Sequence, residues 1–594
     1  METFDVVVIG AGIYGLGAAK TYHQLNQDKS IIILDGDSTL GGVWAKDRLY
    51  PDLKTNNMLG TFEFPDFPMD TETFGVKPGE HIPGHVMHQY LTKYAERYGI
   101  FDKIRYRTKV VSAEHQDGPD SAGGWTLTLS VENGVSDAKL FARKLIVATG
   151  LTSEAFLPIF KGEQEFGAPV FHTKDFHYHA DDPVKCPTVF GGTKSAWDAV
   201  YSYATNGIKV NWVIRKSGHG PAWMSPPYVT PLKKWLEKLV NTRLLTWFSP
   251  CIWGESDGYT GIRKFLHQTS LGRVITNLFW KIIGNDVITL NKYDSHLETK
   301  KLKPWYPAMF CGTSFSILNY PTDFFDLIRD GKVKIHIADI TNLTPNTVHL
   351  SDGTQLESDT LCCATGWKHL PPIKFLPEGI DRELGLPHKP EDREKGLFTP
   401  STVQKVDAEI FSRFPRLANQ PEENKKLKSL LDAPGLSSKD ETNPYVSLTP
   451  YTLYHFIAPP SARFLFETRD VAFCGMVCNF STVLTAHLQG IWVSAFFANK
   501  LMPAVTSKPI ERIQYETVLH ARFGKWRYPA GHGARQPDFV FDAVPYLDLL
   551  LRDLGLQTRR KREVAGRGWL TEVTEPYGPE DYRGCLVEWV ESQK

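Results

Sequence analysis

Two glycine-rich turns in the first third of the chain could each hold the pyrophosphate of a dinucleotide. The first is Gly10-Ala11-Gly12-Ile13-Tyr14-Gly15, and the second, Gly191-Gly192-Thr193, is an altered relative that also follows an apolar run. In such turns the first glycine permits the bend, the second lets the backbone approach the phosphates, and the third lets a helix pack on the strand. Proteins with two of these turns most often pass a hydride from a nicotinamide to a flavin, so the pair indicates redox chemistry.

The elements around the first turn are those that a dinucleotide site needs. Residues 4–9 predict a strand buried on both faces of a parallel sheet. The helix that follows would point its free amides at the phosphates. A second strand, residues 31–34, ends at Asp35, about twenty residues past Gly15, where a carboxylate can bind ribose hydroxyls. The order of turn, helix, strand and acid predicts a complete nucleotide-binding unit.

The second turn has a similar context and one altered glycine. A strand over residues 188–190 leads into Gly191, and a helix begins through Ser195 and Ala196. Thr193 stands where the middle glycine is expected. Its Cβ narrows the approach to the pyrophosphate, although its hydroxyl could donate a hydrogen bond to a phosphate oxygen.

The strand after the second turn distinguishes between nicotinamide cofactors. It covers residues 210–214 and ends at Arg215-Lys216 instead of at an acid. An acid at this position selects NAD, whereas Arg presents a planar fork that suits the oxygens of the 2′-phosphate of NADP. The sequence therefore predicts NADPH as the electron donor.

Three further motifs carry a resemblance to a known family. Gly41-Gly42-Val43-Trp44 follows the acid, then comes Tyr50-Pro51-Asp52-Leu53-Lys54-Thr55-Asn56-Asn57, and Ala148-Thr149-Gly150 ends a later strand. This order resembles the flavin-containing monooxygenase superfamily, whose members carry such motifs in an FAD-binding domain. A second Ala-Thr-Gly, residues 364–366, resembles the family's return crossing from the NADP domain to the FAD domain. The resemblance implies that the first turn holds FAD.

The resemblance also implies the fold. We expect an α/β protein with two Rossmann-like dinucleotide-binding domains, the NADP domain inserted in the FAD domain, together with helical and C-terminal additions. The expected parts are a first FAD segment over 1–180, an NADP domain over 181–365 with a helical insertion at about 231–290, a second FAD segment over 366–505 with a polar insertion at about 371–445, and a C-terminal extension over 506–594.

The site residues follow from the motifs and the resemblance together. Asn56 occupies the position of the family's active-site asparagine, where a neutral amide can orient a reactive oxygen species or the nicotinamide without adding charge. Gln489 lies on an apolar helix that corresponds to the flavin-facing helix of two-dinucleotide flavoproteins. The predicted cofactor-binding residues are Gly10, Gly12, Tyr14, Gly15, Asp35, Gly42, Val43, Trp44, Asn56, Val110, Thr149, Gly191, Thr193, Ser195, Ala196, Arg215, Lys216 and Gln489.

By resemblance, the reaction inserts one oxygen atom from O2 into a small organic substrate through a C4a-hydroperoxyflavin, as in fungal members that tailor specialised metabolites. The nearest alternative is Baeyer-Villiger oxygenation of a ketone. Those relatives usually carry Asp at the Asn56 position and an Arg that stabilises anions, but the comparable stretch here, residues 309–314, has no Arg. An uncompensated anion in a desolvated site is costly, which disfavours that alternative.

Two other classes remain as alternatives. A disulfide reductase needs a cysteine pair near the flavin, commonly soon after the first Gly-Gly, and residues 41–60 contain no cysteine. A non-enzymatic protein stabilised by bound flavin would result if Thr193 disabled nicotinamide binding.

The composition is that of a globular protein and limits its partners. Of the 594 residues, 42% are hydrophobic and 23% are charged, and the formal net charge of zero gives no signal for nucleic acid. The eight scattered cysteines and the first strand close to Met1 favour a reduced, cytoplasmic setting without a metal cluster. The segment 233–290, rich in Trp, Leu and cations, could touch a membrane surface, but an inserted helical subdomain is the favoured interpretation. The expected partners are a small-molecule substrate and O2.

Overall fold

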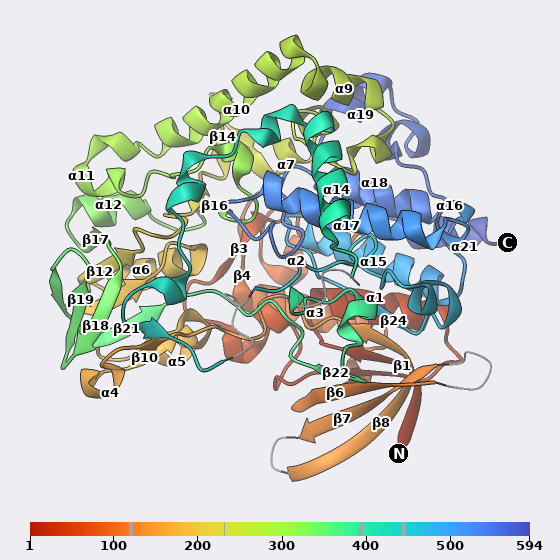
Figure 1. Ribbon diagram of the computed structural model, residues 1–594, viewed down its shortest axis with the longest axis horizontal. Coiled ribbons are helices and arrows are strands. Elements are labelled where there is room, and N and C mark those ends of the chain that lie inside the picture. Colours follow the sequence, from red (N-terminus) through yellow and green to blue (C-terminus); the bar gives the residue numbers. More distant parts are fainter. Residues whose placement is uncertain (118–122, 132–133, 231, 391–395, 441–446) are drawn as a thin grey trace.

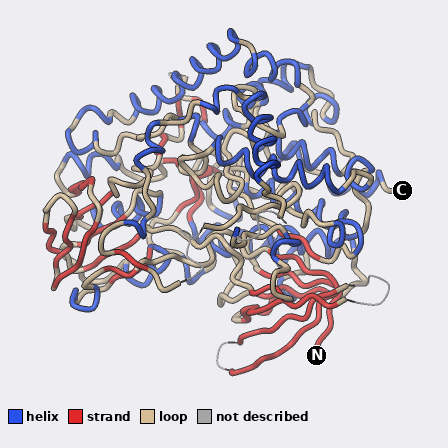
Figure 2. The backbone as a smooth tube through the Cα atoms, viewed as in Figure 1, coloured by secondary structure: helices blue, strands red, loops and turns tan. Residues whose placement is uncertain are grey.

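The computed structural model describes residues 1–117, 123–131, 134–230, 232–390, 396–440 and 447–594. Its fold is α/β, and its two largest sheets lie apart, with most of the helices on one side of them (Figures 1 and 2). The first is a mixed sheet whose parallel part carries the first glycine turn, and the second is a five-stranded parallel sheet that carries the second turn.

The first sheet has the first glycine turn at the end of its central strand. Its parallel part has the strand order β5–β2–β1–β8–β24. From β8 an antiparallel extension continues through β7 to β6, and β22 then pairs with β6 in parallel. The strands are β1 (Glu2–Ile9), β2 (Ile31–Leu34), β5 (Ile104–Arg105), β6 (Thr108–Gln116), β7 (Gly124–Val131), β8 (Gly134–Val147), β22 (Lys374–Leu376) and β24 (Val471–Phe473).

The apolar run in β1 is explained by burial on both faces. Val6 and Val8 belong to the apolar cluster that contains α1 (Ile13–Leu25) and α15 (Thr482–Phe497). Val7 and Ile9 point to the other face and join the cluster of β7 and β8. Because successive side chains of a strand alternate between faces, a strand covered on both sides requires apolar residues at every position.

The second sheet is entirely parallel, with the strand order β10–β21–β11–β12–β17. The helix after the second glycine turn, α6 (Lys194–Thr205), packs on it, and the Trp197 ring lies 5.1 Å from the ring of Trp212. The strands are β10 (Val170–His172), β11 (Pro187–Phe190), β12 (Val210–Ile214), β17 (Val333–Ile337) and β21 (Thr360–Cys363).

The second sheet is inserted into the first. All of its strands lie in the sequence between β8 and β24, and β24 then pairs with β8 in parallel to complete the first sheet. This arrangement is the one that the two Ala-Thr-Gly segments led us to expect. The expected insertion limits at residues 231 and 445 lie outside the described residues, so those limits stay predictions.

A helical layer lies on one side of the two sheets (Figure 1). It is formed by α7 (Leu236–Val240), α8 (Arg243–Thr246), α9 (Thr260–Gln268), α10 (Ser270–Leu290), α14 (Pro400–Arg413), α17 (Ile510–Arg527), α18 (Ala543–Asp553), α19 (Trp569–Thr574) and α21 (Cys585–Ser592). Within the described ranges, none of the helices has both the length and the apolar character needed to cross a bilayer.

A buried ionic cluster fixes the C-terminal extension to this layer. Arg243 of α8 donates from Nη1 to Asp548 at 2.7 Å and from Nε to Glu572 at 2.8 Å, and all three side chains are buried. The charges are paired and hydrogen-bonded, which is the condition under which buried ions are tolerated. The last part of the chain is therefore packed against the helical layer as part of the folded body.

Candidate cofactor and active site

The first glycine turn is shaped to accept a group in front of α1. Gly10 has a φ of 106°, and a Cβ there would collide with the carbonyl oxygen of Ala148. Gly12 is the N-cap of α1 and has no side-chain cap, and a Cβ on it would lie 3.7 Å from Cα of Gly42. Gly41 N–H donates to Ala11 O at 2.9 Å, which holds the two glycine segments together. The space before the helix is thus walled by backbone, as a pyrophosphate site requires.

Asp35 borders this turn from the end of β2. Its carboxylate accepts N–H groups from Ala11 at 2.6 Å and Asp37 at 2.8 Å. Burial raises the pKa of Asp35 to about 6, while these two amides act in the opposite direction. Each carboxylate oxygen keeps a lone pair that a ribose hydroxyl could use.

A buried hydroxyl in the first Ala-Thr-Gly segment lacks a hydrogen-bond partner. Thr149 Oγ1 is buried and has no hydrogen-bond partner within the described residues. Buried polar atoms are rarely left unpaired, so this one fits a bound group. Together with the turn and Asp35, it makes the residues around β1 suitable for a dinucleotide.

Of the other predicted residues of the first unit, Tyr14, Val43 and Trp44 belong to the two glycine segments, whereas Val110 belongs to β6. Tyr14 packs against Gly475, where a Cβ would come 2.6 Å from Tyr14 Cδ2. Trp44 is buried, whereas Val43 is exposed. Val110 is buried in β6, where it pairs with Leu129.

The second turn repeats the backbone of the first. Gly191 has a φ of 130°, and a Cβ there would meet the carbonyl oxygen of Ala364, just as Gly10 meets Ala148. Thr193 is the N-cap of α6 with φ −81° and ψ 169°, close to the −80° and −176° of Gly12. Because this is an ordinary extended backbone, threonine replaces the glycine without strain.

The side chains at the start of α6 are small or hydroxylated. Thr193 is exposed, and its Oγ1 lies 3.2 Å from Oγ of Ser195. Ala196 is buried against the sheet. Two hydroxyls at an uncapped helix N-terminus can both donate to phosphate oxygens.

The two cationic residues after β12 have different surroundings in the structure. The Arg215 guanidinium donates to the backbone carbonyls of Ser429 at 3.0 Å and Lys428 at 2.8 Å. Lys428 N–H in turn donates to Ser217 O at 2.9 Å, so this segment is docked on the loop that begins with Arg215. Lys216 is exposed. Of the two, Lys216 is the one whose charge faces solvent beside the second turn.

The strand β3 (Lys54–Met58) presents its two asparagines to opposite faces. The buried Asn57 donates from Nδ2 to Phe480 O at 3.1 Å. Asn56 is half-buried, and within the described part of the chain no hydrogen bond of its side chain is found. Asn319 fixes the strand by donating from Nδ2 to Lys54 O at 3.1 Å and to Thr55 O at 3.2 Å. Asn57 thus has a structural partner, whereas the described part of the chain supplies none for the Asn56 amide.

A buried carboxylate beside β3 was missed by the sequence analysis. Glu237 of α7 accepts Met58 N–H at 3.0 Å, Thr61 Oγ1–H at 3.2 Å and Trp235 Nε1–H at 2.6 Å. Burial raises the pKa of Glu237 to about 7, and the three donors partly offset this. The residue ties the helical layer to the strand that carries Asn56.

Gln489 is committed to the protein. Its Oε1 accepts Gly475 N–H at 3.0 Å, and its Nε2 donates to Tyr546 OH at 2.9 Å. Both ends of this buried amide therefore have protein partners, so Gln489 holds α15 against the segment after β24 and against α18.

The C-terminal extension also reaches the site, a role that no motif indicated. Asp538 accepts N–H groups from Thr313 and His532, each at 2.5 Å. Phe539 N–H donates to Cys478 O at 2.9 Å, next to the start of α15. One segment thus joins the loop before β16 (Phe315–Ile317) to the segment before α15. Phe315 lies in that neighbourhood, with its ring 6.0 Å from the ring of Phe480.

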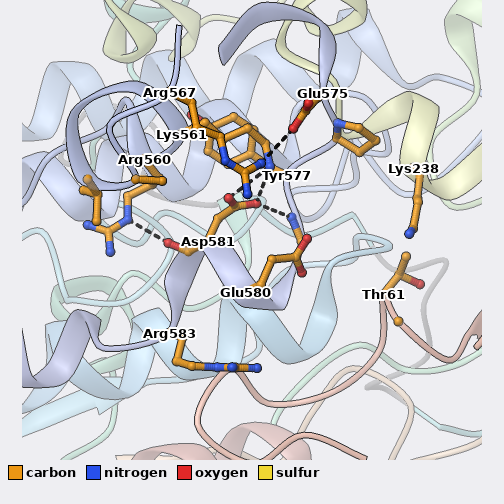
Figure 3. A pocket seen from close by; sticks show the side chains of 15 residues that line it. Thr61, Lys238, Arg560, Lys561, Arg567, Glu575, Tyr577, Glu580, Asp581 and Arg583 are labelled. Carbon is orange, nitrogen blue, oxygen red and sulfur yellow. Dashed lines mark hydrogen bonds and ion pairs between the residues drawn. The ribbon is translucent and has the colours of Figure 1, made fainter. Parts of the chain in front are cut away.

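A cavity of about 390 Å³ lies behind β3, between the turn at Gly60 and Thr61, Lys238 of α7 and the C-terminal extension (Figure 3). Most of its charges are paired across the wall: Lys561 lies 3.0 Å from Asp581, and Arg567 lies 2.9 Å from Glu575. Asn56 does not line it. The cavity adjoins the Glu237 side of β3 and is distinct from the two glycine turns.

Comparisons with known proteins agree with this geometry. The family model of pyridine nucleotide-disulphide oxidoreductases matches residues 7–246, which include both turns. The FAD-dependent monooxygenase rstn6 of Aspergillus nomiae is 32% identical over 99% of this chain and 98% of its own length. The FAD-dependent monooxygenase resA of Aspergillus sclerotiorum is 33% identical over 100% of this chain and 99% of its own length.

A solved structure shows the same fold at low sequence identity. The closed crystal structure of cyclohexanone monooxygenase has a TM-score of 0.55 and 14% identity, covering 100% of this chain and 98% of that chain. The two Aspergillus relatives cover 99% or more of the chain at more than 30% identity. The chain belongs to the flavin monooxygenase superfamily and is an FAD-dependent monooxygenase.

Proposed function

We propose that this FAD-dependent monooxygenase takes its electrons from NADPH and transfers one oxygen atom of O2 to a small organic substrate. The observation that carries the proposal is the second turn. Its backbone repeats that of the first turn, it ends in two hydroxylated residues at the start of α6, and the cationic pair follows at the end of β12. Such a site suits a dinucleotide that carries an additional phosphate.

Bound FAD supplies the redox chemistry, taking two electrons from the nicotinamide and activating O2 once reduced. The protein supplies binding, orientation and exclusion of water. We assign Gly10, Gly12, Tyr14, Gly15, Asp35, Gly42, Val43, Trp44, Val110 and Thr149 to FAD, and Gly191, Thr193, Ser195, Ala196, Arg215 and Lys216 to NADPH. Gln489 acts indirectly, through the position of α15.

Asn56 is the proposed catalytic residue. It lies on a strand fixed on one side by Glu237 and on the other by Asn319, so its position is determined by the protein before any ligand binds. A neutral amide both donates and accepts, and it can orient the nicotinamide or an oxygen species without introducing charge.

The electron donor is tested by mixing the purified enzyme with NADPH or NADH without oxygen and recording flavin absorbance. We expect NADPH to bleach the flavin. Lys216→Ala should raise the KM for NADPH about tenfold and leave that for NADH unchanged, because only NADPH carries the 2′-phosphate. Lys216 is a cleaner probe than Arg215, which also holds the segment at Lys428. Absence of bleaching would refute the proposal and favour a non-catalytic flavoprotein.

The oxygen transfer is tested with ¹⁸O2 and three probe classes: a tertiary amine, an aryl methyl sulfide and a cyclic ketone. One labelled oxygen in the product of any of these is the expected result. Consumption of NADPH with release of hydrogen peroxide alone, in all three cases, would contradict the transfer step while leaving the assignment of the donor intact.

Baeyer-Villiger oxygenation of a ketone is a second candidate because of one buried cation. Arg527 is fully buried, donates from Nη2 to Ser249 Oγ at 3.0 Å, and has no partner for Nη1 among the described residues. Burial raises the pKa of the Cys311 thiol to about 12, and the charge of Arg527 acts in the opposite direction. Cys311 lies within residues 309–314, the stretch that contains no Arg. A cation in a dry site can stabilise an anionic intermediate. Formation of an ester from the cyclic ketone, lost in Arg527→Met, would favour this candidate.

A further inference from the structure

The outer face of α10 is apolar and uncovered. Leu271, Val274, Ile275, Leu278 and Ile282 are between 38% and 63% exposed. Their spacing places them on one face of the helix, because residues three and four apart lie above one another. Figure 1 shows α10 along the outer edge of the molecule, with no other element beyond it.

The opposite face of α10 is the one that packs on the protein. Gly272, Thr276, Trp280 and Gly284 recur at every fourth position and are buried. Thr276 Oγ1 donates to Leu266 O at 3.2 Å, and Trp280 Nε1 donates to Phe248 O at 3.0 Å. The helix therefore turns small or hydrogen-bonding residues inward and large aliphatic residues outward. A surface helix ordinarily has the reverse arrangement, so an apolar partner is missing on the outside.

The charged residues of α9 and α10 are cationic except Asp286, which accepts Thr230 N–H at 2.7 Å. The segment from Thr260 to Asn285 contains four cationic residues and no Asp or Glu. Arg263 is buried and paired with Asp257 at 2.7 Å, but Lys264 and Lys281 are exposed. Phe265, in the second half of α9, is exposed as well. An apolar stripe flanked by cations has the composition of a helix that lies in the interface of an anionic bilayer.

We propose that the outer face of α10, together with Phe265, docks on a membrane surface that carries anionic lipid headgroups, with α10 lying in the plane of the bilayer. The buried inner face keeps α10 attached to the enzyme, so the aliphatic side chains alone enter the lipid. A second copy of the chain is the other conceivable occupant. Pairing two such faces would bring Lys264 and Lys281 of both copies together at a cost, whereas lipid phosphates neutralise them. This inference does not depend on NADPH use or on the substrate.

The test is co-sedimentation of the flavin-loaded enzyme with vesicles of phosphatidylcholine alone or with about 30% phosphatidylserine. We expect stronger binding to the anionic vesicles and weaker binding at high salt. Val274→Asn combined with Leu278→Gln should lower the partition coefficient at least about tenfold, because two aliphatic side chains no longer enter the lipid. Lys264→Gln combined with Lys281→Gln should remove the preference for phosphatidylserine.

Val587→Asn is the matched control, since Val587 is 59% exposed on α21, away from this face. It should bind vesicles like the parent. Flavin absorbance and thermal unfolding check that every variant is folded. Three results would overturn the proposal: no binding of the parent to anionic vesicles, equal binding of the parent and the Val274/Leu278 variant, or sedimentation analysis showing a dimer that this variant abolishes.

Discussion

Glu237 offers a direct test of how the helical layer is coupled to the active-site strand. The change is Glu237→Gln, which keeps the shape of the side chain and removes its titration. In the parent, the carboxylate accepts three hydrogen bonds, one of them from the amide of Met58 in β3. Burial raises its pKa in the folded protein from the ordinary 4.5 to about 7.

The sign and size of the effect follow from proton linkage. Because its folded pKa is higher, the folded state binds the proton more tightly than the unfolded state does. The contribution of Glu237 to stability is therefore most favourable below about pH 4.5 and is lost as pH rises to about 7. The difference between the folded and unfolded pKa values corresponds to a change of about 3 kcal/mol in the free energy of unfolding. The glutamine variant should lack this loss.

The measurement is hydrogen exchange at the amide of Met58, because a large chain seldom unfolds in a single step and this amide reports the opening that exposes Glu237. After correction for intrinsic rates, the opening free energy of the parent should fall by about 2.5 kcal/mol between pH 5 and pH 8 relative to the variant. Glu72→Gln, an exposed position on α2 (Thr71–Phe74), is the control and should follow the parent. Parallel pH profiles of the parent and Glu237→Gln would refute the reasoning.

Three further outcomes are expected. Gly10→Ala should destabilise the fold by about 3 kcal/mol or more, because Gly10 has a positive φ and a Cβ there would collide with Ala148 O. Gly12→Ala should stay folded and bind FAD about tenfold more weakly. Calorimetry measures the first effect and flavin titration the second, and equal behaviour of the two variants would contradict the geometry. Arg243→Met should cost about 3 to 5 kcal/mol by leaving Asp548 and its acidic neighbour buried without a cation, seen as a lower unfolding temperature and faster proteolysis of the C-terminal extension. Asn56→Ala should keep the unfolding temperature and lower the fraction of NADPH converted to oxygenated product about tenfold; unchanged coupling would exclude its catalytic role.

The parts of the fold that were predictable from sequence are those determined by neighbouring residues. The unit from β1 to Asp35 depends on a buried strand, three glycines and a helix start, all within one short stretch, and the structure has each element where it was expected. The second turn could be predicted for the same reason. Thr193 replaces its middle glycine, but the backbone at that position is extended and free of strain.

The parts that could not be predicted depend on contacts between distant segments. Glu237 meets Met58 across 179 positions in the sequence, and Asp538 meets Thr313 across 225. Neither acid lies in a motif, since its role is set by where the helical layer folds back. The same applies to Arg215, whose guanidinium is held by carbonyls of a segment far away in the sequence. The cofactor assignments of individual residues stay predictions.

The pairing of β24 with β8 bears on how a new chain matures. Val471 sits beside Leu145 and Phe473 beside Val147, with the whole inserted sheet encoded between them. At 5 to 20 residues per second, a ribosome needs about 15 to 65 s to pass from one partner to the other. The inserted sheet can fold during that interval, since its last strand ends at Cys363. Until β24 has been synthesised, Leu145–Val147 of β8 lack their neighbour on that edge, so the first sheet is completed only late in synthesis.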